Sequence, residues 1–175
     1  LPRSDIFCTQ FSVRCCLRSC QLILVTHSPF IVQRLSDYTS SLTLVCKNGH
    51  QITTHPFDNL PQLKLSGRSD FSFGLIMFKI FDVPTVELHN ELYGVLQEKN
   101  GQYNEKDIEQ WFARNGLIQN HNWVREHKGV AQTPYPVTLQ TYIRNSIHHP
   151  ENRSNQYKYT ESDLRTSIEE MIKLL

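Results

Sequence analysis

Apolar residues in the first third of the chain fall into short runs that favour strands. Residues 21–26 (QLILVT) form one such run, which is typical of a buried strand in a parallel sheet. Residues 41–55 hold two β-prone segments around a Lys-Asn-Gly sequence at 47–49, which predicts a hairpin. Residues 1–19 show no clean period of a strand or of a helix, so we expect irregular structure there.

From about residue 70 onward the apolar positions follow the period of helices. Residues 70–81 (DFSFGLIMFKIF) are apolar on nearly every side, which indicates a buried helix. Residues 119–137 are polar and aromatic and predict a long loop. The pattern therefore predicts an α/β part, a boundary between residues 56 and 70, and a mainly α-helical part after it.

Capping residues mark where further helices are expected to begin and end. A side-chain oxygen before a periodic segment accepts backbone N–H bonds at a helix start, and glycine or proline ends a helix. The expected helices and their signals are residues 30–38 after Ser28-Pro29, 86–99 after Thr85, 105–114 between Asn104 and Gly116, 137–149 before Pro150, and 161–175 opened by Thr160 with Asp163.

The composition limits the classes of partner. The chain has 175 residues, of which 39% are hydrophobic and 20% are charged, and its formal net charge is +1. A charge this close to zero gives no strong overall field for binding nucleic acid non-specifically. No apolar run approaches the roughly 18 residues that span a membrane, and Arg14 and Arg18 interrupt the apolar stretch that a signal peptide needs. We therefore expect a cytoplasmic protein without a membrane partner.

The cysteines are concentrated at the start of the chain. Cys46 stands apart from the other four, which are Cys8, Cys15, Cys16 and Cys20. A zinc site is one interpretation, but the spacing contains no C-x-x-C pair. A disulfide framework is uncommon in a cytosolic chain. We expect no metal site.

The apolar run 21–26 ends in a Thr-His-Ser sequence, which places a titratable side chain at a strand end. Ligands of open α/β sheets bind at that edge, although a single histidine there more often serves only the local turn. The whole segment 22–33 (LILVTHSPFIVQ) resembles the switch segment of ABC-type and SMC-like AAA ATPases. The resemblance implies that His27, between Thr26 and Ser28, contacts the γ-phosphate and the attacking water, with ATP and Mg²⁺ as cofactors of the intact family member.

The chain departs from that family in the parts that hold phosphate and metal. It contains no G-x-x-x-x-G-K-[S/T] loop and no apolar strand ending in Asp-Glu. We therefore expect no ATP hydrolysis by this chain alone, and no cofactor for it.

Codons for LPRSDIFCTQ read two bases later can encode PEIGYFLHP, which resembles the family element before the switch strand. Residues 1–19 are thus expected to be an out-of-frame segment, the alternative being a genuine divergent segment.

A second candidate cluster lies at the end of the helix expected before Pro150. Arg144, Asn145, His148 and His149 combine a side chain that moves protons near neutral pH with a planar fork that suits a phosphate. On an ideal helix Arg144 is about 40° from His148 and about 140° from His149, so His148 rivals His149. The alternative is structural, because the helix dipole favours cations at a helix C-terminus.

The pattern R-N-x-x-x-H at 144–149 fits the motif of HEPN ribonucleases. The segments 83–100, 138–152 and 159–175 together resemble the C-terminal region of bacterial AAA-family ATPases of defence or toxin type. The resemblance covers residues 20–175. In HEPN ribonucleases two protomers bring Arg and His together and promote attack of the ribose 2′-OH on the adjacent phosphate without metal.

The resemblance implies a P-loop-type ATPase remnant at residues 20–60, followed by a helical HEPN-like domain at 70–175. It implies RNA cleavage, a homodimer formed through the helical domain, and a role in phage defence beside an accessory defence protein. The alternatives are a non-catalytic helical interaction module and a degraded pseudogene product.

Trp123 lies in a polar stretch with Arg125, His127 and Lys128. Such residues can contact RNA by stacking and by charge. We favour the other interpretation, in which Trp123 is a partly buried anchor of the loop.

Overall fold

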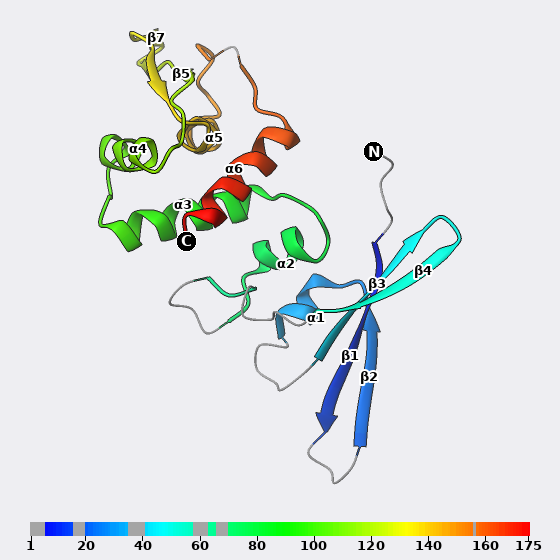
Figure 1. The fold of residues 1–175 in the computed structure, drawn as a ribbon. Helices are drawn as coiled ribbons and strands as arrows, with labels where there is room; N and C mark the ends of the chain where they lie inside the picture. Colours follow the sequence, from blue (N-terminus) through cyan, green and yellow to red (C-terminus); the bar gives the residue numbers. More distant parts are fainter. Residues whose placement is uncertain (1–5, 16–19, 35–40, 58–62, 66–69, 156) are drawn as a thin grey trace. The chain divides into compact units, whose positions relative to one another are not determined.

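A computed structural model gives the structure of residues 6–15, 20–34, 41–57, 63–65, 70–155 and 157–175. The chain divides into two compact units, a first unit of residues 1–83 and a second unit of residues 84–175. The first unit begins with β-strands, and the second unit is mainly α-helical (Figure 1). The mixed α/β class expected from the sequence is therefore confirmed. No helix in the described part of the chain is both long and apolar enough to cross a membrane.

The first unit contains a four-stranded sheet in which all paired neighbours run antiparallel. The strands, in the order β2-β1-β3-β4, are β1 (Ile6–Cys15), β2 (Cys20–Thr26), β3 (Ser41–Asn48) and β4 (Gln51–Pro56). The hairpin expected over 41–55 is confirmed by the pairing of β3 with β4. Gly49 takes a φ of 60° at its turn, a conformation that glycine adopts without steric cost.

Two expectations about this sheet are wrong. The irregular segment expected over residues 1–19 contains β1, which pairs with both β2 and β3. The parallel, buried strand expected at 21–26 is antiparallel to β1, and Val25 is 59% exposed. The connection between β1 and β2 is far shorter than the dozen or so residues that a parallel crossover requires. A short apolar run does not by itself distinguish the two arrangements.

Helix α1 (Pro29–Gln33) follows β2 almost directly, as the Ser28-Pro29 signal predicts. Pro29 occupies the first helical position, where the missing N–H costs no hydrogen bond. The Gln33 Nε2 atom donates to the Phe71 carbonyl oxygen at 3.3 Å, which ties the end of α1 to the segment before the next helix. The remainder of the expected helix, residues 35–38, lies outside the described residues.

Helix α2 (Phe73–Lys79) confirms the buried helix expected over residues 70–81. Its buried residues are Gly74, Leu75, Ile76 and Phe78. α2 contacts α1, and the rings of Phe30 and Phe73 lie 4.9 Å apart. Because α2 packs on α1, the first unit ends at Val83, beyond the boundary expected between residues 56 and 70.

The described part of the second unit contains four helices, and each begins where a cap residue precedes an amphipathic segment. The helices are α3 (Val86–Asn100), α4 (Glu105–Arg114), α5 (Leu139–His148) and α6 (Glu161–Lys173). Their cap residues, each accepting a backbone N–H three residues on, are Thr85, Asn104, Thr138 and Thr160. The helix starts at Thr85, Asn104 and Thr160 are therefore confirmed, including the capping box of Thr160 with Asp163.

The core of the second unit lies between α3, α5 and α6, which contact one another pairwise. Figure 1 shows α3 and α6 lying side by side. The most deeply buried apolar residues on these helices and α4 are Leu88, Leu92, Leu96, Ile108, Phe112, Ile143, Ile168 and Met171. Their burial fixes the orientation of the polar face of α5.

The long loop expected over residues 119–137 instead contains two small antiparallel sheets. The strands are β5 (His121–Trp123) paired with β8 (Tyr135–Val137), and β6 (Glu126–His127) paired with β7 (Val130–Ala131). Lys128 and Gly129 form the turn of the β6–β7 hairpin with φ of 52° and 76°. Trp123 is 2% exposed and packs with Val137 and Tyr142, so it is a buried anchor.

Candidate functional site

The end of α5 brings Arg144, Asn145 and His149 to one cavity. The cavity has a volume of about 660 Å³, and these three residues are among those that line it. Helix α5 ends at His148, and His149 has φ −127° and ψ 59°, so the chain leaves helical geometry at His149. The separation of about 140° between Arg144 and His149 on an ideal helix therefore does not apply. His148 is exposed and does not line this cavity.

The cavity wall includes charged side chains from several segments besides α5. Besides Arg144, the wall contains two cationic side chains, Arg125 and Lys128. It also contains three acidic side chains, those of Glu105, Glu126 and Glu151. Glu126 Oε2 accepts one hydrogen bond from the backbone N of Arg153 and another from Oγ of Ser154, each at 3.2 Å. His149 Nδ1 lies 3.4 Å from Glu151 Oε1. Neighbouring donors thus compensate part of the acidic charge in the wall.

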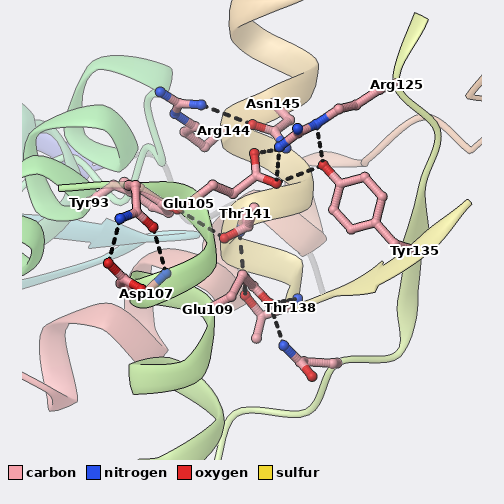
Figure 2. A network of polar contacts seen from close by, with 12 residues as sticks. Tyr93, Glu105, Asp107, Glu109, Arg125, Tyr135, Thr138, Thr141, Arg144 and Asn145 are labelled. Carbon is pink, nitrogen blue, oxygen red and sulfur yellow. Dashed lines mark hydrogen bonds and ion pairs between the residues drawn. The ribbon is translucent and has the colours of Figure 1, made fainter. Parts of the chain in front are cut away.

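Glu105 connects the two arginines of the cavity through a chain of hydrogen bonds (Figure 2). Glu105 Oε2 accepts from Asn145 Nδ2 at 2.9 Å, and Asn145 Oδ1 accepts from Arg144 Nη1 at 3.0 Å. Glu105 Oε1 accepts from Tyr135 Oη at 2.6 Å and from Arg125 Nη2 at 3.0 Å. Asn145 is only 1% exposed, and its two hydrogen bonds hold its amide in one orientation between a carboxylate and a guanidinium group.

The environment of Glu105 keeps its carboxyl group ionised. Burial alone would raise the pKa of Glu105, but hydrogen bonds from Tyr135 and Asn145 and the charge of Arg125 outweigh it and lower the pKa. Burial and the bond to Glu105 raise the pKa of Tyr135, which stays a neutral donor. Glu105 is also the first residue of α4, where the helix dipole favours an anion.

A second acid of α4 fixes the start of α5. Glu109 is 5% exposed and accepts from the backbone N of Thr138 at 2.9 Å and from its Oγ1 at 2.6 Å. Thr138 is the cap of α5, so α4 holds the residue from which α5 begins. Farther along α5, Thr141 Oγ1 lies 2.9 Å from Tyr93 Oη of α3. These bonds place the Arg144 side of α5 beside Glu105.

Arg144 also lies against an aromatic ring. Its guanidinium carbon is 5.8 Å from the centroid of the Tyr93 ring, within the range of a cation–π contact. The pKa of His148 is lowered by partial loss of solvent around its ring and by the neighbouring Arg144 and His149. His149 lies near Trp123, with ring centroids 6.3 Å apart.

Sequence reasoning found part of this site and missed the rest. It named Arg144, Asn145 and His149, and it weighed Arg125 and Lys128 as RNA contacts. Glu105 carried no signal, because a glutamate after an asparagine cap looks like any acid at a helix start. Its partners Asn145 and Tyr135 are 40 and 30 residues away in the chain, and only the fold brings them together.

The first unit holds the other candidate residues. His27 is exposed and lies directly after β2 and before α1, so the predicted strand–turn–helix placement is confirmed. Thr26 is 9% exposed, and its Oγ1 accepts from the Ser28 backbone N at 3.0 Å. Ser28 forms no side-chain cap bond to α1, so the expected capping role of its hydroxyl is wrong. The turn between β2 and α1 is instead held by the hydrogen bond that Thr26 Oγ1 accepts.

The described residues contain no group of three or more His, Cys, Asp or Glu side chains that could hold a metal ion. Cys46 is a half-buried free thiol. The side chains of Cys8, Cys15, Cys16 and Cys20 lie outside those that the structure describes, and the zinc interpretation falls on them.

Comparisons of the chain with protein-family models, with curated proteins and with solved structures found no match. The resemblance to AAA ATPases and HEPN ribonucleases therefore stays a prediction. The geometry of the cavity is the basis for inferring the function.

Proposed function

We propose that the second unit is a metal-independent endoribonuclease whose active site is the cavity lined by Arg144, Asn145 and His149. The observation that carries the proposal is the convergence of an arginine and a histidine in one cavity, across a helix end that would separate them on an ideal helix. Two further cations, Arg125 and Lys128, line the same cavity and suit a phosphodiester backbone.

In the proposed reaction Arg144 binds the non-bridging oxygens of the scissile phosphate and stabilises the negative charge that develops there. His149 accepts the proton of the ribose 2′-OH through Nε2, since Nδ1 faces Glu151. The 2′-oxygen then forms a bond to phosphorus, and the bond from phosphorus to the 5′-oxygen breaks. Water protonates the leaving oxygen, and the hydroxide that remains takes up the proton held by His149. The products are a 2′,3′-cyclic phosphate and a 5′-hydroxyl, and His149 returns to its starting state.

Asn145 and Glu105 have positioning roles in this scheme. Asn145 accepts from Arg144 Nη1 and donates to Glu105, so the guanidinium plane is oriented before substrate binds. Glu105 also holds Arg125 through a salt bridge of 3.0 Å. Orienting groups in advance is how a site lowers the cost of reaching the transition state.

We expect the full chain to cut single-stranded RNA but not DNA of the same sequence or the 2′-O-methyl form of the RNA. Both analogues lack the attacking 2′-OH. The products should carry 2′,3′-cyclic phosphate and 5′-hydroxyl ends, and EDTA should leave the rate unchanged. Gel analysis of end-labelled oligonucleotides measures this, and cleavage of the DNA or loss of activity in EDTA would contradict the mechanism.

We propose that the first unit is the C-terminal part of an ATPase head. In the intact family member, ATP hydrolysis by that head would control the ribonuclease. The support is the segment 22–33 together with the position of His27 between β2 and α1. In the same scheme the second unit forms a homodimer, for which sedimentation equilibrium is the direct measurement.

The chain alone is expected to release no phosphate from ATP above background, because it contains no loop to cradle the phosphates. A coupled phosphate assay with Mg²⁺ measures this, with the His27→Ala variant as the matched control. Equal background in both chains is the expected result. Turnover in the wild type that disappears in His27→Ala would show that the chain has a complete ATPase site.

A further inference from the structure

A second cavity adjoins the proposed active site and shares part of its wall. It has a volume of about 290 Å³ and is lined by Trp123, His149 and Asn152, which also line the first cavity. His149 therefore stands on the wall common to both cavities. A strand whose phosphate is held by Arg144 in the first cavity would bring the adjoining nucleotide to the second.

The second cavity differs from the first in its chemistry. Tyr157 and Tyr159 line it together with Trp123, and Lys158 lies between the two tyrosines in the chain. Aromatic side chains stack on the faces of nucleobases, and a nearby cation suits the phosphate that accompanies the base. The first cavity, by contrast, is lined mainly by charged and amide side chains.

We propose that this second cavity is a nucleobase subsite, in which the base of a nucleotide next to the scissile phosphate stacks against Tyr159. The subsite rests on the proposed ribonuclease function, because its relation to the reaction comes through His149. It adds a determinant of binding that the Arg–His pair does not supply.

Aromatic contacts behind the cavity hold its wall in place. The Tyr142 ring makes edge contacts with Trp123 and Tyr157, each with centroids 5.5 Å apart. Tyr142 Oη donates to the Tyr157 carbonyl oxygen at 2.7 Å, and Tyr157 Oη donates to Asp163 Oδ2 at 2.6 Å. A wall fixed by these contacts loses little freedom when a base enters, which favours binding.

The amide groups near the cavity are already engaged with the backbone of Val124. Asn155 Oδ1 accepts from Val124 N at 2.8 Å, and Asn155 Nδ2 donates to Val124 O at 3.0 Å. Asn152 Nδ2 donates to the same carbonyl oxygen at 2.8 Å. Side chains that usually read base edges are thus occupied, so the subsite holds a base by stacking and discriminates weakly among the four bases.

The test measures binding of two labelled oligonucleotides to the full chain by fluorescence anisotropy. One is a short single-stranded 2′-O-methyl RNA, which the proposed mechanism cannot cut, and the other is the same backbone without bases. Tyr159→Ala is expected to raise the Kd for the RNA about 10-fold and to leave the Kd for the abasic backbone unchanged. Tyr159→Phe keeps the ring and should bind the RNA like the wild type. Tyr103→Ala, a change at a 75% exposed tyrosine away from both cavities, is the control.

The outcomes separate the subsite from the ribonuclease. An unchanged Kd for Tyr159→Ala, or equal weakening of both oligonucleotides, overturns the subsite. If Arg144→Ala still weakens both oligonucleotides in that case, the phosphate site stands without it. If the wild type binds neither oligonucleotide, or if Arg144→Ala changes neither Kd, both the ribonuclease and the subsite are overturned.

Discussion

Replacing His149 with alanine is expected to lower the rate of RNA cleavage by about 100- to 10,000-fold, the usual contribution of a positioned proton-transfer group. The reason is that His149 lines the cavity beside Arg144, and its ring nitrogen is the candidate acceptor for the 2′-OH proton. Single-turnover cleavage of an end-labelled oligonucleotide measures the loss. Circular dichroism of the variant checks that α5 still forms.

His148→Ala is the matched control, because it removes a neighbouring histidine that does not line the cavity. It should cut RNA at a rate near that of the wild type. A reversed result, with His148→Ala inactive and His149→Ala active, would assign the proton transfer to His148. The pairing of Arg144 with His148 expected on an ideal helix would then describe the working site.

Arg144→Ala should reduce cleavage to a similar extent as His149→Ala, and Arg144→Lys should restore little. A lysine carries the charge but lacks the planar fork that donates to Asn145 Oδ1 and to a phosphate at once. A non-catalytic helical interaction module makes a different prediction. In that case both substitutions change the melting temperature or the self-association of the chain, and no variant affects RNA.

The parts of the fold that the sequence predicted are those fixed by local chemistry. The starts of α3, α4 and α6 follow from Thr85, Asn104 and Thr160, because a cap acts within one helical turn. The direction of β2 depends on its pairing with β1, which no pattern inside residues 21–26 encodes. Residues 1–19 lack a clean period, yet β1 forms there by pairing on both sides.

The candidate site shows the same division between local and distant causes. The chemistry of the residue types was enough to predict Arg144, Asn145 and the two histidines as candidates. Ideal helical geometry, however, favoured His148 over His149 as the partner of Arg144. The break in the helix at His149 is what turns this side chain to the cavity, and Pro150 was the only sign of it in the sequence. Glu105 lies far from Asn145 along the chain, so its role emerges only from the fold, which brings a side chain of α4 within hydrogen-bonding distance of one on α5.

Glu105→Ala is expected to lower the free energy of unfolding by about 2 kcal/mol and to slow RNA cleavage about 10-fold or more. The substitution leaves the buried amide of Asn145 without its acceptor and releases Arg125 and Tyr135 from their shared carboxylate. Arg144 then loses the fixed partner that orients its guanidinium. Urea unfolding followed by tryptophan fluorescence reports on this unit, because both tryptophans of the chain belong to it.

Glu161→Ala is the matched control for Glu105→Ala. Glu161 is also the first residue of its helix, so both substitutions lose the same interaction with a helix dipole, worth about 0.5 kcal/mol. Glu161 is exposed, whereas the Glu105 side chain is 18% exposed and holds three donors. Equal losses of stability in the two variants would show that the hydrogen bonds around Glu105 contribute little.

The stabilisation by Glu105 should also depend on pH in a defined direction. Because the folded state lowers the pKa of this carboxyl from its usual 4.5, the ionised form stabilises the fold fully above that value. The contribution is lost as the pH falls through the lowered pKa of the folded state. The stability difference between wild type and Glu105→Gln should therefore be largest at neutral pH and shrink below about pH 4.5. A difference that grows under acid conditions would mean that burial, and not Arg125 with its hydrogen-bonded neighbours, dominates the pKa of Glu105.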